Sequence, residues 1–233
     1  LAARGLLPSR ETWSVVDLGA GYGATTLGLG RLCKRLGLAR SLRVKAIDDD
    51  QGGLDALEQL AKETRGGALA ALSVPIELEP LVGSVAVADP SVLVRGADLA
   101  MAGFVVNELF PLAAEGGRTE DDRLELLERW LARITGSLAD AGVLALLEPA
   151  LREPTRTLQR LRDRLVSGGL DAVHPCTHRA PCPLLARERD WCHAELPIAL
   201  PSALIPIARE AGLRFEGLSY ATLSLRSGAP HAL

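Results

Sequence analysis

Apolar and polar positions along the chain follow two periods. Apolar runs of strand length occupy residues 13–17, 42–48, 82–88, 97–102, 142–147 and 214–225. Between them, apolar residues recur three or four positions apart over 24–36, 54–64, 120–139, 154–168 and 202–211, as amphipathic helices require. Strands that alternate with helices predict a parallel sheet covered on both faces. We therefore expect one α/β domain spanning residues 1–233.

One stretch, residues 174–201, interrupts this pattern. It is rich in Pro, Cys and His and has no clear period. A connection of this length inside a compact domain needs something else to order it. We treat 174–201 as a Cys-rich insertion within the single domain.

The charge balance limits the kind of partner. The formal net charge of −3 at pH 7 excludes a protein that coats nucleic acid with an overall basic surface. Residues 151–164 nevertheless carry five arginines. Such a run is typical of a solvated helix face, and it also suits a patch that faces RNA phosphates.

Targeting signals are not evident in the sequence. No run reaches the roughly 18 consecutive apolar residues that a membrane span needs, and no signal peptide is recognisable. We therefore expect a cytoplasmic protein with no membrane contact, and the Arg-, Ala- and Leu-rich composition suggests a bacterial source. The chain starts at Leu1 rather than Met, so we expect a trimmed or partial sequence.

The turn between the first predicted strand and helix is rich in glycine. It contains Asp17, Gly19, Ala20, Gly21 and Gly23. Glycine allows positive φ and close approach to a ligand, and the following helix offers free N–H groups. The order D-x-G-x-G-x-G resembles the first motif of class I S-adenosylmethionine-dependent methyltransferases more than a dinucleotide site; the alternative is an ordinary tight turn. The resemblance implies S-adenosylmethionine and a Rossmann-like, mostly parallel seven-stranded sheet.

Carboxylates at strand ends are candidate partners of this cofactor. Asp17 would hold the glycine turn near the methionine part. Asp48, at the end of the second strand, can accept both ribose hydroxyls, with Asp49 beside it. Asp89, after the predicted strand 82–88, resembles the residue that contacts the adenine amino group in many methyltransferases. Solvated strand ends are the alternative for Asp48 and Asp89.

Acceptor chemistry is less well defined. The segment after the fourth strand, MAGFVVNELF, lacks the Asn/Asp-Pro-Pro-aromatic motif of base-amino methyltransferases and has no cysteine to attack a pyrimidine. Asn107 and Glu108 are catalytic candidates that could face the methyl acceptor. The alternative is that they form a polar pair at a helix N-terminus. Glu148, at the end of the fifth strand, is a third catalytic candidate, as a general base.

Cysteines in the insertion are candidate metal ligands. Cys176, Cys182 and Cys192 have the spacing C-x5-C-x9-C, and His193 follows directly. Thiolates bind Zn²⁺ or an iron–sulfur cluster well, and either would order a Pro-rich loop. Three unligated cysteines are the alternative. Cys33, on the first helix, fits a small core residue.

Taken together, these motifs resemble a specific family. VVDLGAGYGA, FVVNEL, LLEPA, the run PCTHRAPCPL…DWCH and the late FEGLSYATLSL occur in the order seen in the methyltransferase-like factors associated with the mitochondrial ribosomal small subunit and in their bacterial relatives. The resemblance implies a small-subunit role, in rRNA methylation or assembly, and a four-cysteine metal site, with an iron–sulfur cluster as the leading occupant. The family's fourth cysteine has no match here, so we expect His193, His178 or an outside group to complete the site, or the fourth ligand to be lost with a missing tail.

Three functions remain open at this point. The first is a methyltransferase acting on small-subunit rRNA. The second is a non-catalytic assembly factor that binds rRNA. The third is a small-molecule or protein methyltransferase with a structural metal loop. The sequence leaves the methyl acceptor and the oligomeric state open.

Overall fold

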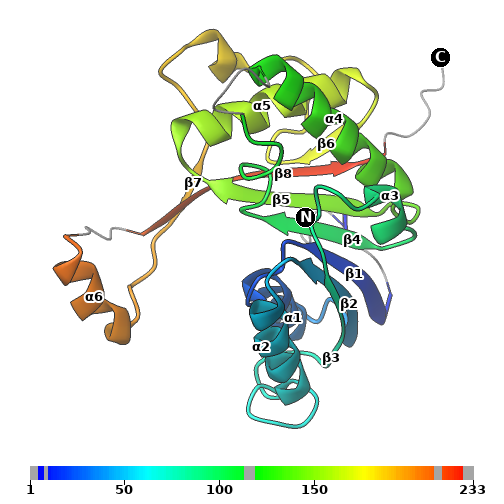
Figure 1. Cartoon of the computed structure of the whole chain (residues 1–233), viewed down its shortest axis with the longest axis vertical. Coiled ribbons are helices and arrows are strands. Elements are labelled where there is room, and N and C mark those ends of the chain that lie inside the picture. Colours follow the sequence, from blue (N-terminus) through cyan, green and yellow to red (C-terminus); the bar gives the residue numbers. More distant parts are fainter. Residues whose placement is uncertain (1–4, 8–9, 113–118, 213–216, 228–233) are drawn as a thin grey trace.

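The computed structural model describes residues 5–7, 10–112, 119–212 and 217–227, which form a sheet with helices on both faces (Figure 1). The strands are β1 (Thr12–Leu18), β2 (Ser41–Asp48), β3 (Ile76–Val82), β4 (Leu99–Gly103), β5 (Val143–Pro149), β6 (Asp171–His174), β7 (Ala194–Leu196) and β8 (Leu218–Arg226). The helices are α1 (Ala24–Leu36), α2 (Gln51–Glu63), α3 (Pro90–Leu93), α4 (Glu120–Ser137), α5 (Arg152–Ser167) and α6 (Ile205–Glu210), with 3-10 turns η2 (Pro183–Ala186) and η3 (Ser202–Leu204).

The strand order places a ligand crevice at the centre of the sheet. The order is β3-β2-β1-β4-β5-β8-β6, and β7 pairs with β8 outside this path. Strands β1 to β5 run parallel, whereas β8 is antiparallel to each of its partners. The chain crosses from one side of β1 to the other between β3 and β4. In open α/β sheets a ligand binds outside the carboxyl ends of the strands at such a switch point.

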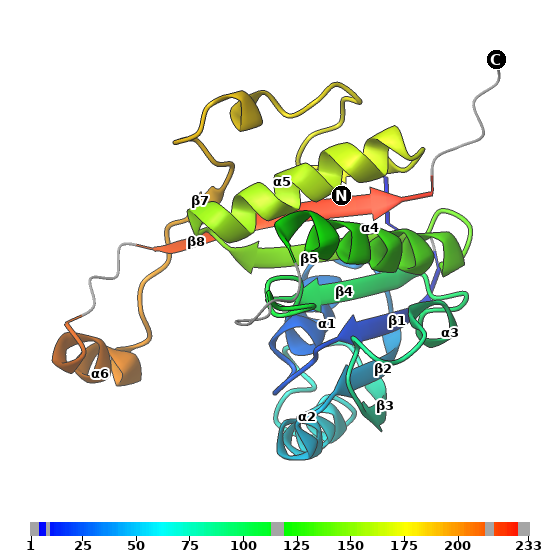
Figure 2. The same cartoon turned by 45° about the horizontal axis from the view of Figure 1, so that its top comes forward.

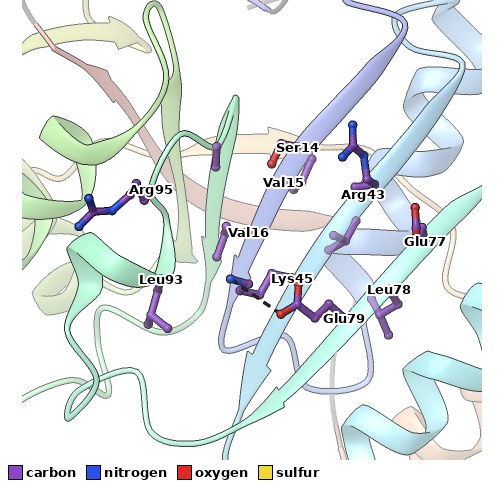
Figure 3. Close-up of a pocket in the computed structure, with 12 residues that line it drawn as sticks. Ser14, Val15, Val16, Arg43, Lys45, Glu77, Leu78, Glu79, Leu93 and Arg95 are labelled. Carbon is purple, nitrogen blue, oxygen red and sulfur yellow. Dashed lines mark ion pairs between the residues drawn. The ribbon is translucent and has the colours of Figure 1, made fainter.

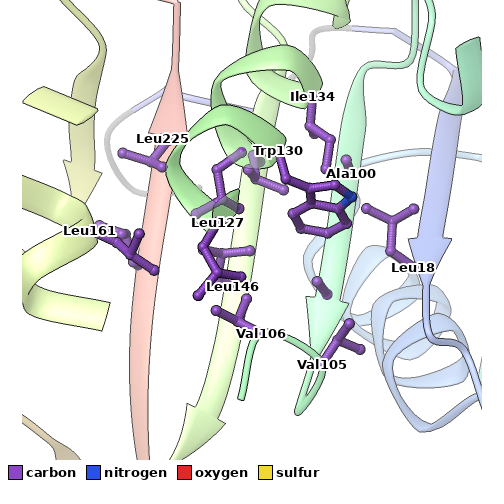
Figure 4. Close-up of a cluster of buried hydrophobic side chains, with 14 of the residues drawn as sticks. Leu18, Ala100, Val105, Val106, Leu127, Trp130, Ile134, Leu146, Leu161 and Leu225 are labelled. Atoms are coloured by element: carbon purple, nitrogen blue, oxygen red, sulfur yellow. The ribbon is translucent and has the colours of Figure 1, made fainter. Parts of the chain in front are cut away.

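Side chains of β1 alternate between two apolar cores. Trp13 and Val15 pack with Cys33 of α1, on the face that α1 and α2 cover. Val16 and Leu18 belong to the larger cluster beneath α4 and α5, in which Leu127 is fully buried (Figure 4). Burial on both faces explains why β1 reads as a nearly continuous apolar run in the sequence.

Among the described residues, no long helix covers one part of the sheet. Helix α3 is a single turn, and beside it the face of β1–β3 opposite α1 and α2 forms a shallow cavity of about 420 Å³ (Figure 3). Arg43 lies opposite Glu77, and Lys45 lies opposite Glu79 across the β2–β3 pair. Opposite charges at neighbouring positions suit a solvated sheet face, so this surface is stable without a covering helix.

The predicted elements agree with the structure except at its edges. The run 82–88 was expected to be a strand, but β3 lies at Ile76–Val82 and pairs with β2 through IELEPLV. The positions of the short strands β6 and β7 were not predicted; seven strands lie on the path from β3 to β6, as expected, and β7 is an eighth strand outside it. For the last strand, β8 begins at Leu218, and residues 214–216 of the expected run lie outside the described residues.

A peripheral segment extends from the sheet beyond β7. Figure 2 shows α6 standing apart from the body of the domain. Exposed apolar side chains on this segment include Ile198, Leu204 and Ile207. Within the described ranges, no helix has the length and apolar character needed to cross a membrane.

Candidate cofactor site and cysteine loop

The glycine turn connects β1 to α1 at the carboxyl edge of the sheet. The amides of Gly19 and Ala20 donate to the carbonyl oxygen of Ile47 on β2, at 2.8 and 3.0 Å. Gly19, Gly21 and Gly23 all have positive φ, between 48° and 83°. A Cβ on Gly19 would collide with Val105, and one on Gly23 would collide with Leu57. The glycines are therefore required by backbone conformation and, at two positions, by close packing.

Asp17 lies beneath this turn and is fully buried. Its Oδ2 accepts hydrogen bonds from the hydroxyls of Thr25 and Thr26, both at 2.6 Å, and so fixes the first turn of α1. Burial raises the pKa of Asp17, and the two hydroxyls oppose that rise. Its Oδ1 has no hydrogen-bond partner among the described residues. Asp17 can therefore hold the turn, as predicted, through its hydrogen bonds to the first residues of α1.

Asp48 ties the end of β2 to the same turn. Its Oδ2 accepts from the amide of Gly21 at 2.7 Å, and its Oδ1 accepts from the amide of Asp50 at 2.9 Å. Each carboxylate oxygen can accept a second hydrogen bond. Asp48 can therefore shape the turn and still accept hydroxyl groups from a ligand.

A cavity of about 420 Å³ opens beside the turn, within the usual volume range of small-molecule sites. It is bounded by the turn and the end of β2, by the residues after β3, and by the residues after β4. These are Gly19, Asp48 and Asp49; Gly83, Ser84, Val85 and Ala86; and Gly103, Phe104, Val105, Glu108, Leu109, Phe110 and Pro111. Of the predicted cofactor residues, Gly19, Asp48 and Asp49 line this cavity, and Ala20, Gly21 and Gly23 form the adjoining turn.

Asp89 lies away from this cavity. It caps α3 by accepting from the amide of Ser91 at 2.9 Å, and it pairs with Arg133 at 2.7 Å. The hydrogen bonds from Ser91 and the charge of Arg133 lower its pKa. The Asp89 assignment depended on a strand ending at residue 88. Because β3 ends at Val82, Ser84 and Val85 occupy the position after the strand instead.

Residues 104–110, the wall segment, form one side of the cavity. Glu108 lines the cavity, whereas Asn107 is exposed and does not. Glu148 is buried beneath the segment, with 1% of its surface exposed, and accepts from the amide of Val106 at 2.9 Å. Of the three catalytic candidates, Glu108 alone lines the cavity. Sequence reasoning did not single out Phe104 and Phe110, although only three phenylalanines occur in the chain.

The three cysteines of the insertion share a second cavity, of about 120 Å³. Burial, and then the neighbouring thiols of Cys176 and Cys182, raise the pKa of Cys192. Across the described part of the chain, no group of three His, Cys, Asp or Glu side chains has the arrangement of a metal site. The structure thus brings the predicted thiols to one place without a closed ligand set.

The two histidines proposed to complete this set differ in position. His178 lines the cysteine cavity, and its Nδ1 lies 3.3 Å from the guanidinium of Arg162. His193 stacks on Trp191, with ring centroids 5.9 Å apart, and its Nε2 lies 3.5 Å from Glu195. His193 is absent from the cavity lining.

Most arginines of α5 contact other parts of the protein, so they are not free to form the RNA-binding patch considered from the sequence. Arg156 and Arg162 are buried and donate to backbone carbonyls of the cysteine loop, residues 175–192. Arg160 and Arg164 pair with acidic residues of α4. Arg152 is exposed and pairs with Glu153 at 2.9 Å. The run 151–164 is therefore mainly an internal scaffold rather than a solvated or phosphate-facing surface.

Comparison with known structures shows a methyltransferase fold. A structure of an S-adenosylmethionine-dependent methyltransferase from Clostridium acetobutylicum is similar with a TM-score of 0.53 and 9% identity, covering 98% of this chain and 88% of that one. A putative class I enzyme of this type from Listeria monocytogenes has a TM-score of 0.53 at 11% identity, covering 99% and 58%. At these identities the likeness establishes the α/β Rossmann-like methyltransferase fold and its mostly parallel sheet.

The family is established by sequence. A search of curated proteins gave no match. The model of the family described as mitochondrial small ribosomal subunit Rsm22 matches residues 86–226, more than half of the chain, from the cavity edge after β3 through the wall segment and the cysteine loop to β8. The chain therefore belongs to the Rsm22 family of the mitochondrial small ribosomal subunit.

Proposed function

We propose that this protein binds S-adenosylmethionine in the cavity beside the glycine turn and acts on, or in the assembly of, the small ribosomal subunit. The main support for this proposal is that Gly19, Asp48 and Asp49 line the same cavity, at the switch point of the sheet. The glycine turn brings backbone close to that space, and Asp48 retains capacity to accept sugar hydroxyls. The fold and the family agree with this assignment.

Calorimetric titration with S-adenosylmethionine tests the cofactor assignment. The wild-type protein should bind, and Gly21→Arg should lose binding, because Gly21 has φ of 48° and donates to Asp48. Gly28→Ala is a matched control, since Gly28 lies on an exposed face of α1 with open space around its Cβ position. Equal affinity in wild type and Gly21→Arg would overturn the assignment.

Methyl transfer is the chemistry that this site would support. Bound S-adenosylmethionine would supply an electrophilic methyl group. The wall segment would exclude water from one side, and the cavity would align donor and acceptor. Glu108 is the acidic residue placed on the wall to accept a proton, should the acceptor need a base. Label transfer to immature small subunits, lost in Glu108→Gln, would support catalysis; cofactor binding without label transfer would support an assembly factor.

The ribosomal partner can be tested independently of catalysis. The family membership supports a small-subunit partner, with rRNA as its proposed contact. Co-sedimentation with small subunits should weaken as salt rises if phosphates are bound, because binding releases counterions from the phosphates and this release is less favourable at high salt. Binding that is insensitive to salt would instead favour a protein contact. No association at any salt concentration would favour a small-molecule or protein methyltransferase.

We also propose that the cysteine cavity holds an iron–sulfur cluster, or Zn²⁺ as the alternative. The donor chemistry fits, because three soft thiols face one small cavity. Both amide atoms of Gln159, which also lines it, are buried without a partner among the described residues, so the cavity contains polar groups that an occupant can satisfy. Cys176, Cys182 and Cys192 would supply ligands, with His178 better placed than His193 for a fourth.

Metal content after anaerobic purification tests this assignment. The protein should carry iron with visible absorbance, or zinc without it, and Cys182→Ser should lose the metal. Cys33→Ala is the control, because Cys33 lies in the core, where burial raises its pKa to about 11. Metal-free wild-type protein, or equal loss in both variants, would contradict the site.

A further inference from the structure

The wall segment holds a backbone conformation that needs support. Phe104 and Phe110, at its two ends, have φ of 62° and 51°. Bulky side chains rarely adopt positive φ, and such a residue is strained unless its surroundings enforce that conformation. The segment also contributes much of the cofactor cavity lining. Whatever enforces this conformation therefore shapes the site.

A buried carboxyl group supports one side of the segment. Glu148 Oε1 accepts from the amide of Val106 at 2.9 Å, while its Oε2 is buried without a hydrogen-bond partner among the described residues. Burial raises the pKa of Glu148 to about 7, the amides of Val106 and Asn107 oppose this rise, and the charge of Glu108 adds to it. Glu148 is absent from the cavity lining, so it acts on the backbone of the wall rather than on a ligand.

A cation supports the carbonyl groups of the same segment. The guanidinium of Arg123, on α4, donates to the carbonyls of Val106 at 2.9 Å, Asn107 at 3.0 Å and Leu109 at 3.2 Å. Arg123 is 8% exposed, and burial lowers its pKa while Glu148 opposes that change. Amides of the segment thus face a carboxylate, and carbonyls face a guanidinium. Charge-assisted hydrogen bonds of this kind are stronger than neutral ones.

The supported segment touches the glycine turn directly. Val105 occupies the space that a Cβ on Gly19 would need. Val105 is followed by Val106, which both Glu148 and Arg123 hold. A shift of the wall segment would therefore change the surface beside Gly19. The two cavity walls are mechanically linked through this contact.

We propose that Glu148 and Arg123 are positioning residues that lock the wall segment against the glycine turn, so that cofactor affinity depends on two side chains that touch no ligand. The cofactor part of this inference rests on the proposed function. Glu148 is accordingly assigned a role different from the general base considered from the sequence. Among the described residues, the charged groups that influence it are Glu108 and Arg123.

The affinity for S-adenosylmethionine, measured as a function of pH, tests whether Glu148 and Arg123 lock the wall segment in place. In the wild type, affinity should fall about 5-fold or more between pH 8 and pH 6, because a protonated Glu148 holds the Val106 amide less strongly. Glu148→Gln should bind about 5- to 10-fold more weakly at pH 8 and show little dependence on pH. Arg123→Lys should bind about 10-fold more weakly, since one ammonium group cannot serve three carbonyls. Unchanged affinity in both variants would overturn the proposal.

Two controls separate positioning from general destabilisation. Glu153→Gln alters an exposed carboxylate near the start of α5, and Arg129→Lys alters an exposed arginine of α4 that pairs with Glu125. Both should retain wild-type affinity and pH dependence. Thermal melting of every variant identifies those that fail to fold. A pH profile that is the same in Glu148→Gln as in wild type would also contradict the lock.

Amide hydrogen exchange in the ligand-free protein separates failure of this inference from failure of the cofactor assignment. Peptides covering 104–110 should exchange at least 10-fold faster in Glu148→Gln and Arg123→Lys than in wild type at the same pH. If they do and the wild type binds no S-adenosylmethionine, the proposed function fails while the lock stands. If exchange is unchanged in both variants, the lock is refuted whatever the cofactor result.

Discussion

Replacement of Arg156 by Met tests the finding that α5 is an internal scaffold. Its guanidinium donates to the carbonyls of Arg187 and Asp190 at 2.9 and 2.8 Å, and more weakly to those of Leu184 and Leu185 at 3.4 and 3.3 Å. A hydrogen bond to a charged group contributes about 1.5–3 kcal/mol. At the lower end of this range the two short bonds together give roughly 3 kcal/mol, of which water at the loosened loop would restore a part. We expect Arg156→Met to reduce the free energy of unfolding by about 2 kcal/mol.

Urea denaturation measures this loss. With a slope of about 2 kcal/mol per molar urea, the midpoint should fall by about 1 M. Trypsin should also cleave the loop after Arg187 or Arg189 faster than in wild type. Arg152→Met is the control, because Arg152 is exposed and pairs with the adjacent Glu153; the loss of stability in this variant should stay within about 0.5 kcal/mol. Equal, small losses in both variants, with weaker rRNA binding in Arg156→Met, would refute the scaffold interpretation.

Further outcomes follow from the core, the glycine turn and the buried carboxylate. Leu127→Ala removes a fully buried side chain and should cost about 2–5 kcal/mol in urea denaturation, whereas exposed Leu151→Ala should cost less than about 0.5 kcal/mol. Gly19→Ala forces a collision with Val105 at φ of 71°, so calorimetry should show at least a 10-fold loss of S-adenosylmethionine affinity; wild-type affinity would contradict this. The pKa of Glu148 is about 7 when folded, against 4.5 for a free carboxyl, so the folded state binds the extra proton between these values. Its contribution to stability is therefore present below pH 4.5 and is lost as pH rises through 7, by up to roughly 3 kcal/mol. Subtracting the pH profile of Glu148→Gln isolates this contribution, and identical profiles would exclude it.

The central strands and the glycine turn could be predicted because local sequence determines them. Strand β1 is buried on both faces, so its apolar run is unambiguous, and the turn that follows must be glycine-rich where φ is positive. Asp48 was placed correctly at a strand end because the alternating apolar positions of β2 continue up to Ile47. Whether these residues bind S-adenosylmethionine stays a prediction.

Features that depend on tertiary contacts were not predictable in the same way. Strand β3 is an edge strand with alternating Glu and a Pro80, and proline is tolerated at an edge although it argues against a central strand. This obscured the strand, and with it the strand end on which the prediction for Asp89 depended. Arg123 gave no signal, because its role depends on backbone carbonyls 14 to 17 residues away in sequence.

The edge strands at the two borders of the sheet are poorly suited to pair with a strand of a second molecule, which affects aggregation at high protein concentration. On one border, Pro80 lacks an N–H group, and Glu77 and Glu79 carry like charges that would repel an identical strand. On the other, β6 has four residues and is followed directly by Pro175. Proline and like charges on the first border, and a short strand followed by proline on the second, limit how many backbone groups a second molecule could join. The protein should therefore resist fibre-like growth through strand addition, even though its interior strands are strongly apolar.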